Sequence, residues 1–105
     1  MNNLQQLMQM GQQLQARISK LQETLDSQKI SASSGGGMVT ATVDGKGHLR
    51  KITVDRGCVD ADDVEMLEDL ILAAVSQAQA KARELYEEEM RKATGGLPMQ
   101  IPGLL

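Results

Sequence analysis

The sequence predicts an α+β protein in which a small sheet has one long helix before it and another after it. Two observations lead to this fold class. Residues 38–43 and 49–55 are rich in β-branched side chains and surround a turn with two glycines, which is the pattern of a hairpin. The segments before and after the hairpin instead repeat apolar residues every three to four positions, as amphipathic helices do.

The turn of the hairpin reads Asp44-Gly45-Lys46-Gly47. Asp and Gly tolerate the positive φ that tight turns need, so we expect Gly45, Gly47 or both to adopt one. Because side chains alternate along a strand, the apolar residues of the first run share one face and are Val39, Ala41 and Val43. On the second run the apolar partners are Ile52 and Val54, with Leu49 on the opposite face.

The first helix is predicted to begin at Asn3, which forms a capping-box pattern with Gln6. From there, residues recur in alternating steps of three and four and form a heptad seam. The seam consists of Leu4, Leu7, Gly11, Leu14, Ile18, Leu21, Leu25 and Gln28. Residues 30–33 alternate apolar and small polar side chains, so they are either a first strand joined to the hairpin by glycines 35–37 or a linker.

The second helix is predicted to follow an acidic segment in which Asp62 and Glu65 imitate a capping box. Its apolar period includes Leu67, Ile71 and Val75. Alanines at 73, 74, 78, 80 and 82 would permit the close approach of another helix. Glycines 95 and 96 are a fitting stop, so we expect one domain over residues 1–94 and a flexible Gly- and Pro-containing tail over 95–105.

Composition favours association with a second copy of the chain. Aromatic residues make up 1% of the sequence, so the large rings that usually fill a small core are missing. We therefore expect a homodimer, in which the apolar residues of the strands and of the second helix serve as core and dimer contacts. The single cysteine fits a reducing cytosol, and the sequence has neither a signal peptide nor a run of the ~20 apolar residues that a membrane span needs. We expect a cytoplasmic protein without a membrane partner.

No catalytic constellation is found in the sequence. His48 is the only histidine and follows a glycine in the turn, so we interpret it as a solvated residue, and it cannot form a metal site alone. The acidic run 60–65 lacks the glycine and the spacing of a calcium loop. Glycines 35–37 are not followed by Lys-Ser/Thr and a helix, which excludes a phosphate loop. We expect no enzyme activity, no cofactor, no metal and no small-molecule substrate.

The basic residues are the candidates for nucleic-acid contacts, although the net charge of −3 gives no support for DNA binding by itself. The candidates are the bases off the apolar stripes of the helices: Arg17, Lys20, Lys81 and Arg83. Solvated surface charge is the alternative interpretation for all four. Arg91 and Lys92 stand four residues after Glu87 and Glu88, so we expect them to pair within their own helix.

The order of these elements resembles the YbaB/EbfC family of bacterial nucleoid-associated proteins. The resemblance covers essentially the whole chain, and its most specific parts are the hairpin GGGMVTATVDGKG and the segment MLEDLILAAV at 66–75. It implies an α-β-β-β-α protomer with a three-stranded antiparallel sheet, and a homodimer whose projecting helix pairs grip double-stranded DNA in the nucleoid with little sequence preference. Members often have several lysines in the first helix, whereas this one is rich in Gln, which lowers the DNA affinity we expect.

A second hypothesis fits the same features without DNA. Paired helices beside a β-hairpin also occur in cytosolic chaperones and adaptors such as prefoldin, and seven methionines and a negative net charge suit that function. Binding to plain duplex DNA at several salt concentrations would separate the two hypotheses.

Overall fold

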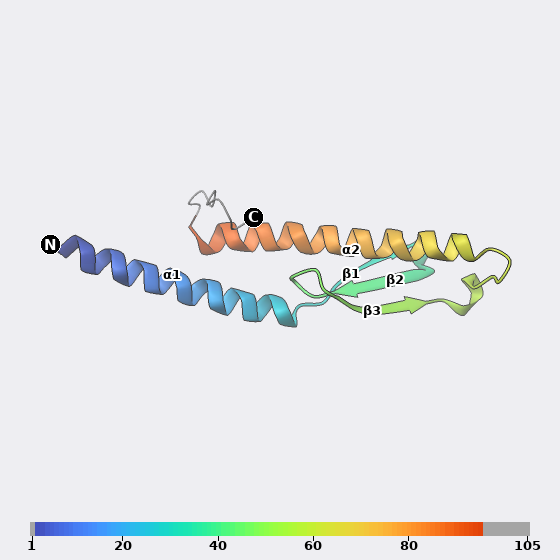
Figure 1. Ribbon diagram of the computed structural model, residues 1–105, viewed down its shortest axis with the longest axis horizontal. Coiled ribbons are helices and arrows are strands. Elements are labelled where there is room, and N and C mark those ends of the chain that lie inside the picture. Colours follow the sequence, from blue (N-terminus) through green and yellow to red (C-terminus); the bar gives the residue numbers. More distant parts are fainter. Residues whose placement is uncertain (1, 96–105) are drawn as a thin grey trace.

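The computed structural model describes residues 2–95 and confirms the predicted α+β order (Figure 1). Its elements are α1 (Asn2–Ser27), β1 (Ile30–Ser34), β2 (Val39–Val43), β3 (Leu49–Val54) and α2 (Val64–Ala93). The molecule is elongated, with axes of 73, 24 and 18 Å. A helix rises 1.5 Å per residue, so α1 and α2 are both much longer than the sheet and must extend past it. The predicted tail at 95–105 lies outside the described residues except for Gly95.

The sheet has the order β1-β2-β3, and both pairs of strands are antiparallel. Residues 30–33, which fitted either a strand or a linker, belong to β1 and pair with β2. Gly35, Gly36 and Gly37 all have positive φ and form the connection between the two strands. Only glycine adopts three such angles in succession at little cost, and the connection is therefore short and tight.

The two faces of the sheet differ in chemistry, as the alternation of the strands predicts. Val39, Ala41 and Val43 are fully buried on the inner face. On the outer face, hydroxyl groups pair across β1 and β2, Ser31 with Thr42 and Ser33 with Thr40, each at 2.8 Å between oxygens. The inner face therefore holds the core, and the outer face is polar and uncovered within residues 2–95.

The predicted position of Leu49 on the opposite face is wrong because a bulge interrupts β3. The register of β2 and β3 shifts between Thr42 and Val43, so that Leu49 becomes the partner of Val43. Residues directly opposite each other share a face, and the shift therefore returns Leu49 to the inner face with Ile52.

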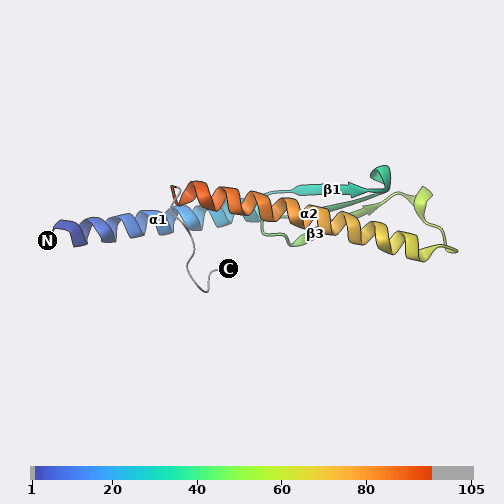
Figure 2. The same cartoon turned by 90° about the horizontal axis from the view of Figure 1, so that it is seen from above.

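Helix α2 lies along the inner face of the sheet and contacts β1 and β2 (Figure 2). Its buried side chains are Ala74, Ala78 and Ala82, which repeat every fourth residue and form a flat stripe. We predicted that the alanines would admit another helix, and this is wrong for the three in the stripe: they pack with the strand residues of the core. Small side chains let the helix backbone come close to the pleated surface.

The predicted helix caps are displaced by one residue. Asp63, not Asp62, caps α2, and its side chain accepts a hydrogen bond from the backbone N–H of Met66 at 3.2 Å. Helix α1 begins at Asn2, so Asn3 lies inside the first turn. Gly95 has a φ of 66° just beyond α2, as expected of a glycine that stops a helix.

The two glycines of the hairpin turn serve different purposes. Gly47 has a φ of 87°, which confirms the prediction that at least one of them is left-handed. Gly45 does not have a positive φ, but its N–H donates a 2.7 Å hydrogen bond to the carbonyl oxygen of Leu25. A Cβ at Gly45 would lie 2.7 Å from that oxygen and 2.8 Å from the Leu25 Cα. Space, rather than φ, requires glycine at 45.

We predict that Gly45→Ala destabilises the protein by about 1–3 kcal/mol, because the methyl group must displace the backbone of α1. Gly11→Ala is the control: nothing lies within 4 Å of the position its Cβ would take, and alanine in a helix should stabilise by about 0.5–1 kcal/mol. Denaturant unfolding of the three proteins measures both changes. If Gly45→Ala unfolds with the wild-type midpoint, the contact with Leu25 is not tight in solution.

Candidate nucleic-acid interface

The helices form a projecting pair, which we call the helical arm: α1 and the last part of α2, residues 81–93. The two helices run in opposite directions, and α1 continues past the end of α2 (Figure 1). Along the predicted seam, burial increases toward the sheet. Leu4 and Leu7 are exposed, Leu14, Ile18 and Leu21 are half-buried, and Leu25 is fully buried. The heptad seam of α1 is therefore the surface that contacts α2.

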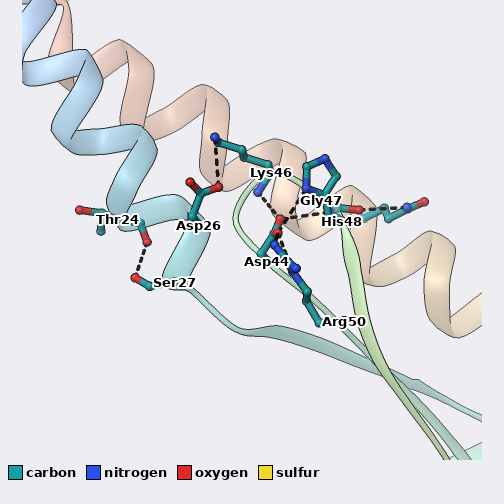
Figure 3. Close-up of polar contacts among 9 residues, drawn as sticks. Thr24, Asp26, Ser27, Asp44, Lys46, Gly47, His48 and Arg50 are labelled. Carbon is teal, nitrogen blue, oxygen red and sulfur yellow. Dashed lines mark hydrogen bonds and ion pairs between the residues drawn. The ribbon is translucent and has the colours of Figure 1, made fainter.

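The arm is anchored at the β2–β3 turn, where the buried carboxylate of Asp44 organises the backbone (Figure 3). One carboxylate oxygen accepts hydrogen bonds from the N–H groups of Lys46 and His48, at 2.9 and 3.0 Å. The other accepts from Nε and Nη2 of Arg50, at 2.9 and 2.7 Å. Nδ1 of His48 lies 3.4 Å from the same oxygen. Four donor groups thus hold one carboxylate and fix the shape of the turn.

These contacts set the pKa of Asp44. Burial of the carboxyl raises its pKa, but hydrogen bonds from the His48 N–H, the Arg50 guanidinium and the Lys46 N–H outweigh burial and lower the pKa to about 2. The carboxylate is therefore charged at any physiological pH. From the sequence, Asp44 is predicted only as a turn residue, and the one signal of a further role is the arginine six residues later.

Both helices are joined to this turn. Lys46 forms a 3.0 Å ion pair with Asp26 near the end of α1, and the Gly45 N–H donates to the α1 backbone. From the other side, Nε2 of Gln79 in α2 donates to the carbonyl oxygen of Gly47 at 3.1 Å. The direction in which α1 leaves the sheet is thus fixed by the turn and by the seam with α2.

The four predicted DNA contacts are all exposed, but they occupy different parts of the arm. Arg17 and Lys20 are three residues apart and share one side of α1. Lys81 and Arg83 are two residues apart and point to different sides of α2. Lys81 reaches the sheet edge, where its Nζ donates to the carbonyl oxygen of Ser31 at 3.3 Å. Within residues 2–95 the side chains of the other three make no hydrogen bond or ion pair.

The predicted pairing at the end of α2 is half right. Nζ of Lys92 lies 3.6 Å from both Glu88 and Glu89, which confirms the Glu88 pair. The expected pair of Glu87 with Arg91 is wrong, since no such contact exists in the described part of the chain. Arg91 is therefore available to a ligand, as are three bases that sequence analysis did not single out: Lys29, Lys51 and Arg56. Nothing in their sequence context distinguishes them from ordinary surface charge.

The predicted core and dimer residues divide by strand. Val39 and Val43 on β2 are fully buried. Val54 and the helix residues Leu67, Ile71 and Val75 are half-buried against that core. Ile52 is 37% and its neighbour Leu49 is 44% exposed, because α2 covers β1 and β2 and leaves β3 bare.

Helical geometry places further apolar side chains beside β3. Gln79 marks the flank of α2 that faces the β2–β3 turn, since it donates to Gly47 there. Val75, Leu72 and Ile71 precede Gln79 by four, seven and eight residues and so lie on the same flank. Leu72 is 66% exposed. We call the group formed by Leu49, Ile52, Ile71, Leu72 and Val75 the apolar strip.

Residues 2–95 give little support for a metal site, a reactive thiol or a membrane span. Groups of His, Cys, Asp and Glu that could hold a metal are not found there. Cys58 is buried and unpaired, and its Sγ lies 3.9 Å from the Met38 carbonyl oxygen. Neither helix, over the residues described, is long and apolar enough to span a membrane.

Comparison with known proteins identifies the family. Residues 1–97 match the model of the YbaB/EbfC DNA-binding family. The chain belongs to this family. A nucleoid-associated protein of Thermoanaerobacter pseudethanolicus is 47% identical over 102 residues, which are 97% of this chain and 90% of that protein. One from Rhodospirillum rubrum is 42% identical over 104 residues, 99% of this chain and 96% of the other.

A solved structure supports the fold. An uncharacterized protein from Helicobacter pylori superposes with a TM-score of 0.77 at 22% identity, over 87% of this chain and 96% of that one. The α-β-β-β-α arrangement is thus shared with another protein of low sequence identity. The YbaB/EbfC match extends past the end of α2, so it takes in the sheet, the anchored turn and the arm together.

We predict that Asp44→Asn lowers the free energy of unfolding at pH 7 by about 1.5–3 kcal/mol, the contribution of hydrogen bonds to a charged group. The wild type should lose the same stabilisation as the pH falls from about 4 to 2, because the folded state holds the carboxyl below its ordinary pKa of 3.8. Urea unfolding at several pH values measures this. The variant should show a flatter pH dependence in that window, and identical profiles would contradict the anchoring role.

Proposed function

We propose that this protein binds double-stranded DNA as a homodimer, through phosphate contacts and with little sequence specificity, as a nucleoid-associated protein. The observation that supports this most is the helical arm. It combines exposed basic side chains that have no ion-pair partner with a fixed direction relative to the sheet. Membership of the YbaB/EbfC DNA-binding family gives the ligand class. The site needs no cofactor or small-molecule substrate, and its place in the cell is the cytoplasmic nucleoid.

The apolar strip is the surface we assign to the homodimer. Isolated exposed apolar residues are normal, but a contiguous group beside a bare strand usually marks an interaction surface. Leu49 and Ile52 of β3 lie on the inner face of the sheet, which one helix only partly covers. A second copy would bury the strip and place a second arm beside the first. Each DNA duplex would then meet twice the number of basic side chains.

The contacts to DNA would come mainly from Arg17, Lys20 and Arg83, with Lys81 nearer the sheet. Long basic side chains on helices neutralise phosphates without reading base edges, which gives affinity with little sequence preference. The sequence has only one aromatic residue, so stacking of aromatic side chains on the nucleobases of single-stranded DNA cannot contribute much. This favours duplex over single-stranded DNA.

We predict that Ile52→Asp converts the dimer into a folded monomer. In a dimer the aspartate would be buried without a partner, whereas in a monomer Ile52 is already at the surface. Sedimentation at micromolar concentration gives the mass, and circular dichroism shows whether the fold is kept. Thr53→Asp, on the outer face one residue later, is the matched control and should stay dimeric. A wild-type monomer under the same conditions would contradict the homodimer.

We predict that Arg17→Gln with Lys20→Gln weakens binding about equally on two unrelated duplexes and lowers the salt slope by about 0.9 for each phosphate that is no longer neutralised. The control is Lys92→Gln, which removes one charge already paired with Glu88, and it is compared with Arg17→Gln and Lys20→Gln made singly. Titrations at several salt concentrations measure both. An unchanged slope in the first variant would exclude Arg17 and Lys20 from the site.

A chaperone or adaptor function is the second candidate, and the exposed tip of α1 favours it. Leu4, Leu7, Met8 and Met10 are each more than half exposed, and such flexible apolar side chains suit unfolded or varied protein partners. In that case the wild type would fail to bind duplex DNA even at low salt and would suppress the aggregation of a model substrate instead.

A further inference from the structure

The beginning of α1 has an apolar stripe that is left bare within residues 2–95. Leu7 and Met10 are 64% and 63% exposed, although they lie on the side of the helix that α2 covers from Leu14 onward. Leu4, three residues before Leu7, is 68% exposed. The spacing of three residues places all of them on one side of the helix. No charged residue occurs from 2 to 16. This part of α1 therefore lacks the charged side chains that are usual on a solvent-exposed helix.

A hollow marks the point where α2 stops covering the seam. It has a volume of about 240 Å³ and lies between Met10, Gly11, Leu14 and Arg17 of α1 and residues 93–95 at the end of α2. Gly11 contributes the space, because nothing lies within 4 Å of the position where a Cβ would be. An apolar residue would otherwise occupy this place in the heptad.

The segment that follows α2 has the composition to fill this surface. Residues 96–105 read GLPMQIPGLL, in which half of the residues are Leu, Met or Ile and none is charged. Pro98 and Pro102 favour an extended conformation in the residues before them. Leu97, Met99 and Ile101 alternate with other residues, and in an extended segment they would face one side.

We propose that residues 96–105 dock in the same chain along the bare seam of α1, covering Leu4, Leu7 and Met10 as α2 covers the later residues. Gly95 is itself a wall of the hollow, so the segment starts at its own docking site. From Gly11 to Leu4 the helix rises about 10 Å, whereas ten extended residues span up to ~33 Å. This attachment gives the segment a high effective concentration, in a monomer and in a dimer alike.

Docking places the segment beside the proposed DNA contact at Arg17, which lines the same hollow. The docked segment would also join the end of α2 to the overhanging turns of α1, so that the tip of the arm moves as one unit. Neither consequence requires a change in the sheet or in the anchored turn.

The test uses the full chain with ¹³C-labelled methionine methyl groups and no DNA. Ile101→Asp should shift the NMR signal of Met10 and increase its contact with a soluble paramagnetic probe. Gln100→Asp adds the same charge at the neighbouring, outward position and should leave Met10 unchanged. Met66, at the far end of α2, is the internal reference and should be the same in all three proteins.

Two results would overturn the proposal. If Met10 is equally accessible to the probe in the wild type and in both variants, residues 96–105 do not cover it. If Met10 is protected to the same degree in all three proteins, residues 96–105 are not what covers it, and protection that falls on dilution would assign the cover to a second copy instead. Because DNA is absent, either result leaves the proposed duplex binding to be judged by its own titration.

Discussion

The arrangement of the molecule depends on one close contact, between the β2–β3 turn and the end of α1. The Gly45 N–H meets the Leu25 carbonyl oxygen at 2.7 Å, and no room remains for a side chain between the two backbones. Asp44 holds the turn in the shape that makes this approach possible, and Gln79 joins the same turn to α2. These contacts therefore join both helices to one turn, while the alanine stripe of α2 holds that helix against the sheet. The proposed grip on a duplex needs this fixed geometry, because contacts from two helices add up only if the separation of the helices is constant.

The bare third strand follows from the width of the elements. Strands are spaced about 4.8 Å apart, and a helix with its side chains is about 10 Å across, so one helix covers two strands and not three. The alanine stripe of α2 strengthens this limit, because small side chains let the helix lie close to β1 and β2 without reaching sideways. β3 is still apolar on its inner face. A single chain with this fold thus cannot bury its own sheet, and the proposed homodimer supplies the covering layer that is missing.

Most of the fold could be predicted from the sequence because its signals are local. The heptad of α1, the β-branched runs and the Asp-Gly turn each define an element within a few residues. The errors have non-local causes. The bulge that returns Leu49 to the inner face depends on pairing with Val43, and the alanine stripe could have met a helix as well as a sheet. For the candidate site, the sequence predicts which basic residues could contact DNA but not how these residues are arranged on the surface. Neither the Asp44 anchor nor the contact of Lys81 with the sheet edge at Ser31 can be inferred without knowing which elements meet.

The ion pairs of the arm explain how a chain with a net charge of −3 can present basic side chains to DNA, which is a polyanion. Helix α2 contains seven acidic and four basic residues, yet Lys92 lies close to both Glu88 and Glu89, and Lys46 pairs with Asp26 on α1. These pairs neutralise acids within the arm and leave Arg17, Lys20 and Arg83 unpaired. At physiological salt the Debye length is about 8 Å, so a bound phosphate responds mainly to the nearest bases. At 0.01 M salt it is about 30 Å, and the repulsion from the whole chain is felt. For the proposed phosphate contacts, the salt slope measured near physiological salt is therefore the one that reports their number.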